Sequence, residues 1–334
     1  MNALNLGTNP LVFNYYQEDY EKWVTDFGNH IKAITLADRI EYPKNFAAGY
    51  AKAKNVEPGL SYRIVNYTLH TDLECMRTAA NELHLMLYFY EIQFDEKVYC
   101  KTGSTIIESN DKYYSIALMT NSLTPQHLRL KKGTIVKGLS VQLSEAWLKE
   151  NIKDLTPEKL EMIKQKDCIT DFISAKQRKV LNDIFISSEQ SLLPGLFIKS
   201  RVLRLTEQFL TRLCHRGLTN MPEFANLKDF QAIVKVEHLL LKNFSADFPS
   251  IEALAKTAYM SKSKLKKLFK KAYGMAIYQY YQKNRMHKAK ELLGSRKHNI
   301  SQVGAMLGYQ NLSNFSVAFK KEFSYLPSEI QEIL

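Results

Sequence analysis

Between about Ser61 and Leu143, short apolar runs alternate with clusters of turn residues. The runs LSYRIVNYTLHT, ELHLMLYFYEIQF, STIIES, YYSIALMT and TIVKGLSVQLS are rich in β-branched and aromatic residues, which favour strands. Stretches such as FDEK, KTGS, ESNDK and KKG separate them and are typical of turns. Several short strands at this spacing predict an antiparallel sandwich or barrel.

From Ser144 to about Arg216 the apolar spacing becomes helical. We expect helices over 144–151, 156–166, 174–187 and 194–216. Thr156 and Pro157 form a plausible N-cap and first-turn pair for the second of them. The stretch CHRGLTNMPEF at 214–224 contains Gly, Pro and Asn, so it is the best candidate for a linker.

The last of these helices has a short coiled-coil-like seam. Ile198, Val202, Leu205 and Phe209 follow one another at steps of four, three and four residues. Such a seam could pair two chains, or it could pack against the strands of its own chain. The sequence leaves both alternatives open.

From Asp229 onward the pattern is helical, and after a first helix near 229–243 it is duplicated. Ile251, Leu254 and Ala255 recur 49 residues later as Ile300, Val303 and Gly304, and Leu265, Phe269, Lys270 and Lys271 recur 50 residues later as Phe315, Phe319, Lys320 and Lys321. Each unit reads as a short helix, a tight connection and a second helix of about ten residues. Small residues, Ala255 and Gly304, stand where the two helices of a helix-turn-helix approach closely.

The second helix of the first unit has an apolar back and a lysine front. In SKSKLKKLFKKAYG at 261–274, six residues are lysine, while Leu265, Leu268, Phe269 and Ala272 line one helical face. Such a helix suits a membrane surface, plain solvation or the phosphates of a nucleic acid. A membrane helix has no use for the duplication or for a turn-separated partner.

One helix is expected to join the two units. MAIYQYYQKNRMHKAKELLG at 275–294 predicts a continuous helix of roughly 18 residues and therefore about 27 Å. One turn of DNA is about 34 Å. A rod of that length can hold two second-position helices in neighbouring major grooves on one face of a duplex.

The positive charge of the chain is concentrated in the same region. The net charge of the 334 residues is +12. Residues 225–334 contain 18 Lys and Arg against 8 Asp and Glu, which is +10, and the remainder contains 28 against 26, which is +2. Such asymmetry indicates contact with a polyanion.

Composition excludes several other classes of protein. Hydrophobic residues make up 45% of the chain, enough for a sizeable core in two or three domains. We find neither a membrane-length apolar run nor a secretion signal and expect a cytoplasmic protein. The cysteines Cys75, Cys100, Cys168 and Cys214 are dispersed, which argues against a disulfide framework or a zinc cluster.

Candidate catalytic chemistry is absent from the strand region. His70, His84 and His127 stand alone on separate segments, whereas a catalytic metal needs convergent imidazole and carboxylate ligands. The tyrosines of the region are interpreted as core and surface strand residues rather than a ligand cage; they are Tyr62, Tyr67, Tyr88, Tyr90, Tyr113 and Tyr114. We therefore predict no catalytic residues, no metal and no cofactor.

Four motifs follow one another in the C-terminal region: SIEALAKTAYMSKSKLKKLFKKAYG, RMHKAKELL, ISQVGAMLGYQNLSNFSVAFKKEF and Pro327. With these motifs in this order, residues 250–330 resemble the DNA-binding domain of the AraC/XylS family of bacterial transcription regulators. Many family members carry an N-terminal cupin-like β-barrel that binds an effector or mediates dimerisation, and the strand region is similar to it in pattern. The expected fold is α+β: a cupin-like antiparallel β-barrel (1–143), a helical connector with possible dimerisation (144–216) and an all-α domain with two helix-turn-helix units (225–334).

The resemblance implies specific contacts with DNA. Positions that match base-contacting residues of the family are Ser263, Lys266 and Lys267 in the first unit and Leu312, Ser313, Ser316 and Val317 in the second. Lys264, Lys270 and Lys271 are better placed for phosphates, and Lys320 and Lys321 lie near the contact positions of the second unit. The residues expected in the core are Leu265, Leu268, Phe269, Phe315, Ala318 and Phe319.

The sequence also departs from the family pattern. The family usually has arginine in place of Val317, glycine in place of Ser324, threonine in place of Leu326 and a small turn residue in place of Tyr259. Arginine can read guanine with two hydrogen bonds, whereas valine offers only apolar contact. Specific readout is therefore expected from the first unit, with the second supplying anchoring and register.

These observations together predict a sequence-specific transcription regulator. Its expected partners are double-stranded promoter or operator DNA and RNA polymerase, with a small-molecule effector and a homodimer both possible and no membrane. Two rivals remain: a cupin-type enzyme with a nucleic-acid-binding tail, and a DNA-binding protein without sequence preference.

Overall fold

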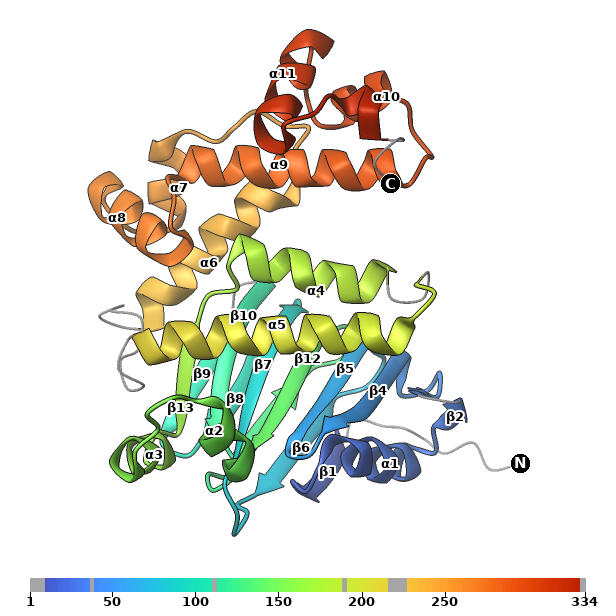
Figure 1. Ribbon diagram of the computed structural model, residues 1–334, viewed down its shortest axis with the longest axis vertical. Coiled ribbons are helices and arrows are strands. Elements are labelled where there is room, and N and C mark those ends of the chain that lie inside the picture. The colour runs from blue at the N-terminus through green and yellow to red at the C-terminus, as the bar shows by residue number, and fades with distance from the viewer. Residues whose placement is uncertain (1–9, 37–38, 110–112, 188–190, 216–226, 331–334) are drawn as a thin grey trace. The chain divides into compact units, whose positions relative to one another are not determined.

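The computed structural model describes residues 10–36, 39–109, 113–187, 191–215 and 227–330 of the chain. The chain divides into two compact units, residues 1–223 and 224–334 (Figure 1). The first contains the β-sheets and the second is helical, so each is considered by itself.

Two sheets form the frame of the first unit. In the described residues, the larger sheet has eight strands in the spatial order β13 (Cys168–Asp171), β10 (Tyr113–Asn121), β7 (His84–Gln93), β12 (Ile135–Ser144), β5 (Leu60–Leu69), β4 (Ala47–Glu57), β3 (Arg39–Glu41) and β2 (Ile34–Leu36). The smaller has five, in the order β1 (Leu11–Tyr16), β6 (Leu73–Thr78), β11 (Gln126–Leu130), β8 (Val98–Thr102) and β9 (Thr105–Ser109). Strand β1 runs parallel to β6, while the other described pairs are antiparallel.

The two sheets are not closed into a barrel, and the arrangement fits the expected cupin-like fold broadly. A barrel requires its first and last strands to pair, whereas both sheets here end in strands with one described neighbour. The two sheets instead face each other, because side chains from both line a common cavity. The strand spacing was equally compatible with this sandwich-like solution.

The central strand β7 is buried on both faces. Leu85, Leu87 and Phe89 belong to a core that also contains residues of the following helices, while Tyr88 and Tyr90 line the cavity between the sheets. Successive side chains of a strand point to opposite faces. This double burial explains why ELHLMLYFYEIQF is a nearly continuous apolar run.

The helices of the first unit are α1 (Tyr20–Ile31), α2 (Glu145–Asn151), α3 (Pro157–Lys164), α4 (Ala175–Ser187) and α5 (Pro194–His215). The four helices expected after Ser144 are confirmed within one or two residues at each end. Thr156 caps α3 as predicted, since its side chain accepts from the Lys159 amide. The five predicted runs correspond to β5, β7, β9, β10 and β12. Strands β1 to β4, β6, β8, β11 and β13 and helix α1 were not anticipated.

Helix α5 lies over the face of the larger sheet that points away from the cavity, with α4 beside it (Figure 1). All four seam residues, Ile198, Val202, Leu205 and Phe209, are at most 2% exposed. The ring of Phe209 meets that of Phe89 edge-on, with centroids 5.9 Å apart. Of the two alternatives for the seam, packing within the chain is the one observed.

The second unit consists of α6 (Leu227–Lys242), α7 (Ile251–Thr257), α8 (Lys262–Tyr273), α9 (Ile277–Gly294), α10 (Ile300–Met306), α11 (Leu312–Phe323) and the 3-10 turn η1 (Pro327–Glu329). The pairs α7–α8 and α10–α11 are the two predicted helix-turn-helix units. Helix α9 has 18 residues, as expected for the joining helix. Within the described residues, no helix has the length and apolar character needed to cross a membrane.

Two of the three isolated histidines, His70 and His127, have hydrogen-bond partners for their side chains within the first unit. His70 Nδ1 lies 2.6 Å from the Lys44 carbonyl oxygen, and His127 Nε2 lies 2.5 Å from Glu74 Oε1. Burial lowers the pKa of His84, so its neutral form is favoured. These contacts agree with the interpretation of the histidines as structural residues.

Replacing a seam residue tests how much the sheet depends on α5. Leu205→Ala should lower the free energy of unfolding by about 2–5 kcal/mol, because it leaves a cavity under the sheet. Leu196→Ala, at a position of the same helix that is 63% exposed, should change it by less than about 0.5 kcal/mol. Tryptophan fluorescence in a denaturant titration reports this unit, since Trp23 and Trp147 both belong to it; equal effects of the two substitutions would contradict the packing described.

Candidate nucleic-acid interface

Helix α8 begins and ends at defined residues. The Ser261 side chain accepts from the Lys264 amide at 3.2 Å, and Ser250 caps α7 in the same way through the Ala253 amide at 3.1 Å. Both serines satisfy amides that the first helical turn leaves unpaired. Gly274 ends α8 in the left-handed conformation, which glycine adopts without steric cost.

The two faces of α8 differ as the sequence predicts. Leu265, Leu268 and Phe269 are buried. The predicted contact residues of this helix are all exposed: Ser263, Lys264, Lys266, Lys267, Lys270 and Lys271. Cationic and apolar faces are thus cleanly separated on a 12-residue helix.

Two acidic side chains compensate the lysines at the start of α8. A helix N-terminus carries partial positive charge and disfavours cations, yet Lys262 and Lys264 occupy the first turn. Lys262 pairs with Glu252, and Lys264 Nζ lies 2.9 Å from Asp229 Oδ1. A phosphate contact by Lys264 therefore competes with an existing ion pair.

Helix α11 is built in the same way but presents different chemistry. The Asn311 side chain accepts from the Ser313 and Asn314 amides at 2.8 and 3.4 Å. Val317 is 68% and Leu312 45% exposed; Ser313, Lys320 and Lys321 are also exposed, and Ser316 is half-buried. Phe315 and Phe319 are fully buried, whereas Ala318, which was expected in the core, is half-buried.

Helix α9 contributes to both helix-turn-helix units. Near its start, the Tyr280 ring packs against Phe269 of α8 with centroids 5.4 Å apart, and its hydroxyl donates to the buried Glu237 of α6. Farther along, Met286 and Leu293 belong to the core that contains Phe315 and Phe319. The predicted joining helix is therefore part of two cores and not a free spacer.

Arg285 of α9 holds the turn of the second unit and was missed at the sequence level. Its Nε donates to the Leu307 carbonyl at 2.7 Å, and its guanidinium carbon lies 4.0 Å from the centroid of the Tyr309 ring. The position of Arg285 in the sequence could have indicated this role. It lies four residues after Tyr281 and four before Ala289, and all three belong to the buried face of α9. An arginine on such a stripe indicates a buried hydrogen-bond partner.

Each helix-turn-helix unit has one non-glycine residue in the left-handed region. Tyr259, in the turn of the first unit, has φ 52°, and its equivalent in the second is Gly308 with φ 76°. At the C-terminal ends of α8 and α11 it is the first unit that has the glycine, since Gly274 has φ 74° and its equivalent Ser324 has φ 69°. The departures noted at Tyr259 and Ser324 therefore fall where the backbone favours glycine.

Comparison with known proteins identifies this arrangement. A family model described as a helix-turn-helix domain matches residues 254–333. The probable transcriptional regulator LumQ of Photobacterium leiognathi is 32% identical over 82 residues, which cover 25% of this chain and 33% of LumQ. The C-terminal unit belongs to the AraC/XylS family of helix-turn-helix domains. The transcriptional activator RhaR of Pectobacterium atrosepticum is 28% identical over 132 residues, which cover 39% of this chain and 46% of RhaR.

Solved structures also match the AraC-type domain. The C-terminal domain of AraT, a response regulator from Geobacillus stearothermophilus, matches with 27% identity and a TM-score of 0.29 over 31% of this chain and 85% of that one. The DNA-binding domain of AdpA, solved in complex with a target DNA, matches with 22% identity and a TM-score of 0.29 over 30% of this chain and 91% of that one. This chain spans between a third and a half of the length of the curated relatives named above.

The two halves of the AraC-type domain carry very different charge. Helix α8 has six lysines and no acidic residue, whereas α11 has two lysines and Glu322. Glu322 in turn lies 3.7 Å from Lys283 Nζ and 3.6 Å from His287 Nε2 of α9. The electrostatic footprint is therefore centred on the first unit.

Ser324→Gly tests the left-handed strain at the end of α11. It should raise the free energy of unfolding of the AraC-type domain by about 1 kcal/mol, because glycine has no Cβ to clash in this conformation. The matched control is Ser295→Gly at the end of α9, where φ is −68°, so that glycine relieves no strain, brings an entropic cost and loses the hydrogen bond from Ser295 Oγ to the Leu292 carbonyl. Thermal unfolding followed by helical circular dichroism measures both; a stabilised Ser295→Gly or an unstabilised Ser324→Gly would refute the strain.

Proposed function

We propose that the chain is a sequence-specific DNA-binding transcription regulator. The observation that carries this proposal is the pair of helix-turn-helix units on one helix, the first of which presents six lysines opposite an apolar back. A merely solvated face needs neither the duplication nor the fixed spacing. The similarity of the C-terminal unit to regulators such as RhaR supports the same conclusion.

In this proposal α8 and α11 enter two successive major grooves. The 18 residues of α9 correspond to about 27 Å, which falls within one DNA turn of about 34 Å. Since α9 packs into the cores of both units, the spacing of the two helix-turn-helix units is already fixed in the free protein, before it binds DNA. Pre-organisation of this kind lowers the ordering cost of binding.

The two second helices have unequal roles in recognition. Ser263, Lys266 and Lys267 of α8 read base edges, and Lys270 and Lys271 contact phosphates; Lys264 does so once Asp229 releases it. Helix α11 makes close apolar and polar contacts with DNA and carries little charge; these contacts come from Leu312, Ser313, Ser316 and Val317. Its Lys320 and Lys321 contact the phosphate backbone of the DNA. Most base discrimination therefore comes from the first half of the site.

The first unit regulates this activity through a bound effector. The cavity between its sheets supports this assignment. Dimerisation through the α5 seam loses its main support, because the seam residues are buried within the chain. The other partner we propose is RNA polymerase, which a regulator at a promoter must meet.

Selection of bound fragments from the host genome, followed by equilibrium binding of the full chain, tests the proposal. One preferred sequence should emerge, and the affinity should fall steeply with salt, with a log–log slope near −0.9 for each of roughly 6 to 10 phosphate contacts. Equal affinity for all duplexes would instead indicate a DNA-binding protein without sequence preference. A flat salt response would exclude the phosphate contacts.

Lysine substitutions separate base readout from backbone contact. Lys266→Ala should cost about 1–3 kcal/mol and relax specificity at one or two positions of the selected site. Lys22→Ala, which removes an exposed lysine of α1 with its own acidic neighbours, should leave affinity unchanged. If Lys266→Ala weakens binding to every sequence equally, Lys266 contacts the backbone and the assignment of base readout to it is wrong.

A further inference from the structure

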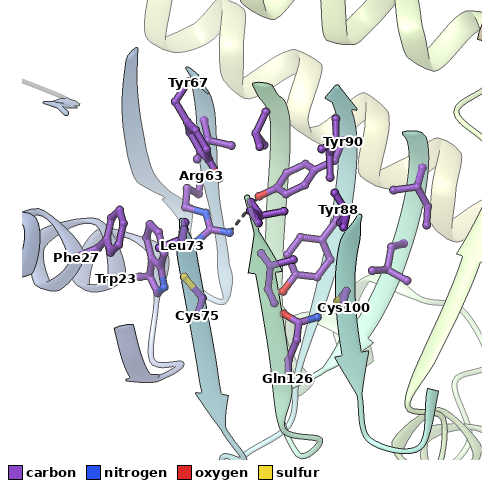
Figure 2. A pocket seen from close by; sticks show the side chains of 18 of the residues that line it. Trp23, Phe27, Arg63, Tyr67, Leu73, Cys75, Tyr88, Tyr90, Cys100 and Gln126 are labelled. Atoms are coloured by element: carbon purple, nitrogen blue, oxygen red, sulfur yellow. Dashed lines mark hydrogen bonds between the residues drawn. The ribbon is translucent and has the colours of Figure 1, made fainter. Parts of the chain in front are cut away.

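A cavity of about 120 Å³ lies between the two sheets of the first unit. Figure 2 shows side chains converging on it from both sheets and from α1. Its wall is largely aromatic and includes Trp23, Phe27, Tyr67, Tyr88 and Tyr90. Engineered apolar cavities of roughly 150 Å³ bind a molecule as large as benzene, so this cavity can hold one small organic ligand.

Arg63 of β5 places a positive charge in this apolar wall. The residue is 8% exposed, and its Nη2 donates to the Tyr90 hydroxyl at 3.1 Å (Figure 2) and to Ser140 Oγ at 3.3 Å. Its guanidinium carbon lies 4.0 Å from the centroid of the Trp23 ring. In the described part of the chain, the guanidinium hydrogen bonds go to hydroxyls, and no carboxylate forms an ion pair with it.

Two hydrogen-bond donors around the cavity lack an acceptor in the described residues. They are Arg63 Nε and Trp23 Nε1. A buried donor without a partner destabilises the fold, and a buried guanidinium without an anion costs more. Both costs would be offset by a ligand that brings an anionic oxygen.

The cavity cannot neutralise Arg63 from its own wall. Burial raises the pKa of the Tyr15, Tyr42 and Tyr67 hydroxyls, and it raises the pKa of the Cys75 thiol to about 12 and of the Cys100 thiol to about 11. These groups are therefore uncharged at neutral pH, whereas a guanidinium stays protonated. One positive charge remains inside an apolar chamber.

We propose that this cavity binds a small organic monoanion, a carboxylate with a short apolar body that is together no larger than about one benzene molecule, with its oxygens against Arg63. The aromatic wall covers the apolar body and Arg63 fixes its orientation. The role of this ligand as an effector rests on the proposed function, whereas its binding does not.

Calorimetry with two isosteric probes on the full chain without DNA tests the charge requirement. Butyrate should bind at least about tenfold more tightly than butyramide, because only the former offers a charge-assisted contact to the guanidinium. Propionate serves as a second, smaller anionic probe. Equal affinity for butyrate and butyramide, or no binding of either anion at millimolar concentration, would overturn the proposal and leave Arg63 a purely structural residue.

Variants locate the contact. Arg63→Gln should abolish the preference for the anionic probe, whereas Arg129→Gln should retain it, because Arg129 is exposed and stacks 4.1 Å from the Tyr99 centroid on the smaller sheet. Tryptophan fluorescence and circular dichroism verify folding. If Arg63→Gln fails to fold, Val136→Phe, which fills the cavity from β12, should abolish binding of both probes, and undiminished butyrate binding to it would contradict the location.

Separate readouts keep this inference distinct from the proposed function. If the full chain binds no anionic probe but still binds the selected DNA site, the proposed ligand is refuted and the proposed function stands. If the chain binds the anionic probe but shows no sequence preference for DNA, the proposed function is refuted and the proposed ligand stands.

Discussion

The packing of α9 into two hydrophobic cores at once is the constraint on which the C-terminal unit depends. Tyr280 of α9 packs against Phe269 of the first helix-turn-helix unit, and Leu293 belongs to the core of the second. Arg285 adds a hydrogen bond to the Leu307 carbonyl, which ties the turn of the second unit to the same helix. Because neither unit can move along α9 without exposing its core, the separation of α8 and α11 is a property of the fold.

Charge on α8 works against the stability of the free protein. The six lysines of this 12-residue helix repel one another. Two of them, Lys262 and Lys264, lie in the first turn, where the partial positive charge of the helix N-terminus disfavours a cation. Glu252 and Asp229 compensate those two, while Leu265, Leu268 and Phe269 hold the helix from behind. Phosphates of a duplex would relieve the remaining repulsion, so the charge that destabilises the free domain favours the bound one. A helix with this arrangement is adapted to a polyanion rather than to water.

Sequence reasoning succeeded where local pattern determines structure. The duplicated apolar spacing predicted both helix-turn-helix units, their buried faces and the length of α9. It also predicted the exposure of the α8 lysines, because a lysine opposite an apolar stripe has only solvent to face. The roles of these lysines on DNA stay predictions, since their exposure does not reveal which of them meets a base.

The rest required contacts between distant segments. Strand spacing alone could not distinguish a closed barrel from two facing sheets, since closure depends on which edge strands pair. Arg63, Tyr88 and Tyr90 looked like ordinary strand residues, and the tyrosines were interpreted as core and surface residues. Tyr67, Tyr88 and Tyr90 in fact surround a cavity with Arg63, because register places alternate residues of β5 and β7 on one inward face. The one available signal was an arginine within the apolar run of β5.

Missing-base interference on the selected DNA site tests the central claim most directly, namely that two units on one rigid helix grip the duplex while the first reads most of the sequence. The account predicts two tracts of interference whose centres are about one helical turn, roughly 10 base pairs, apart, with deep interference in one tract and shallow interference in the other. A single tract, or two tracts of equal depth, would contradict it.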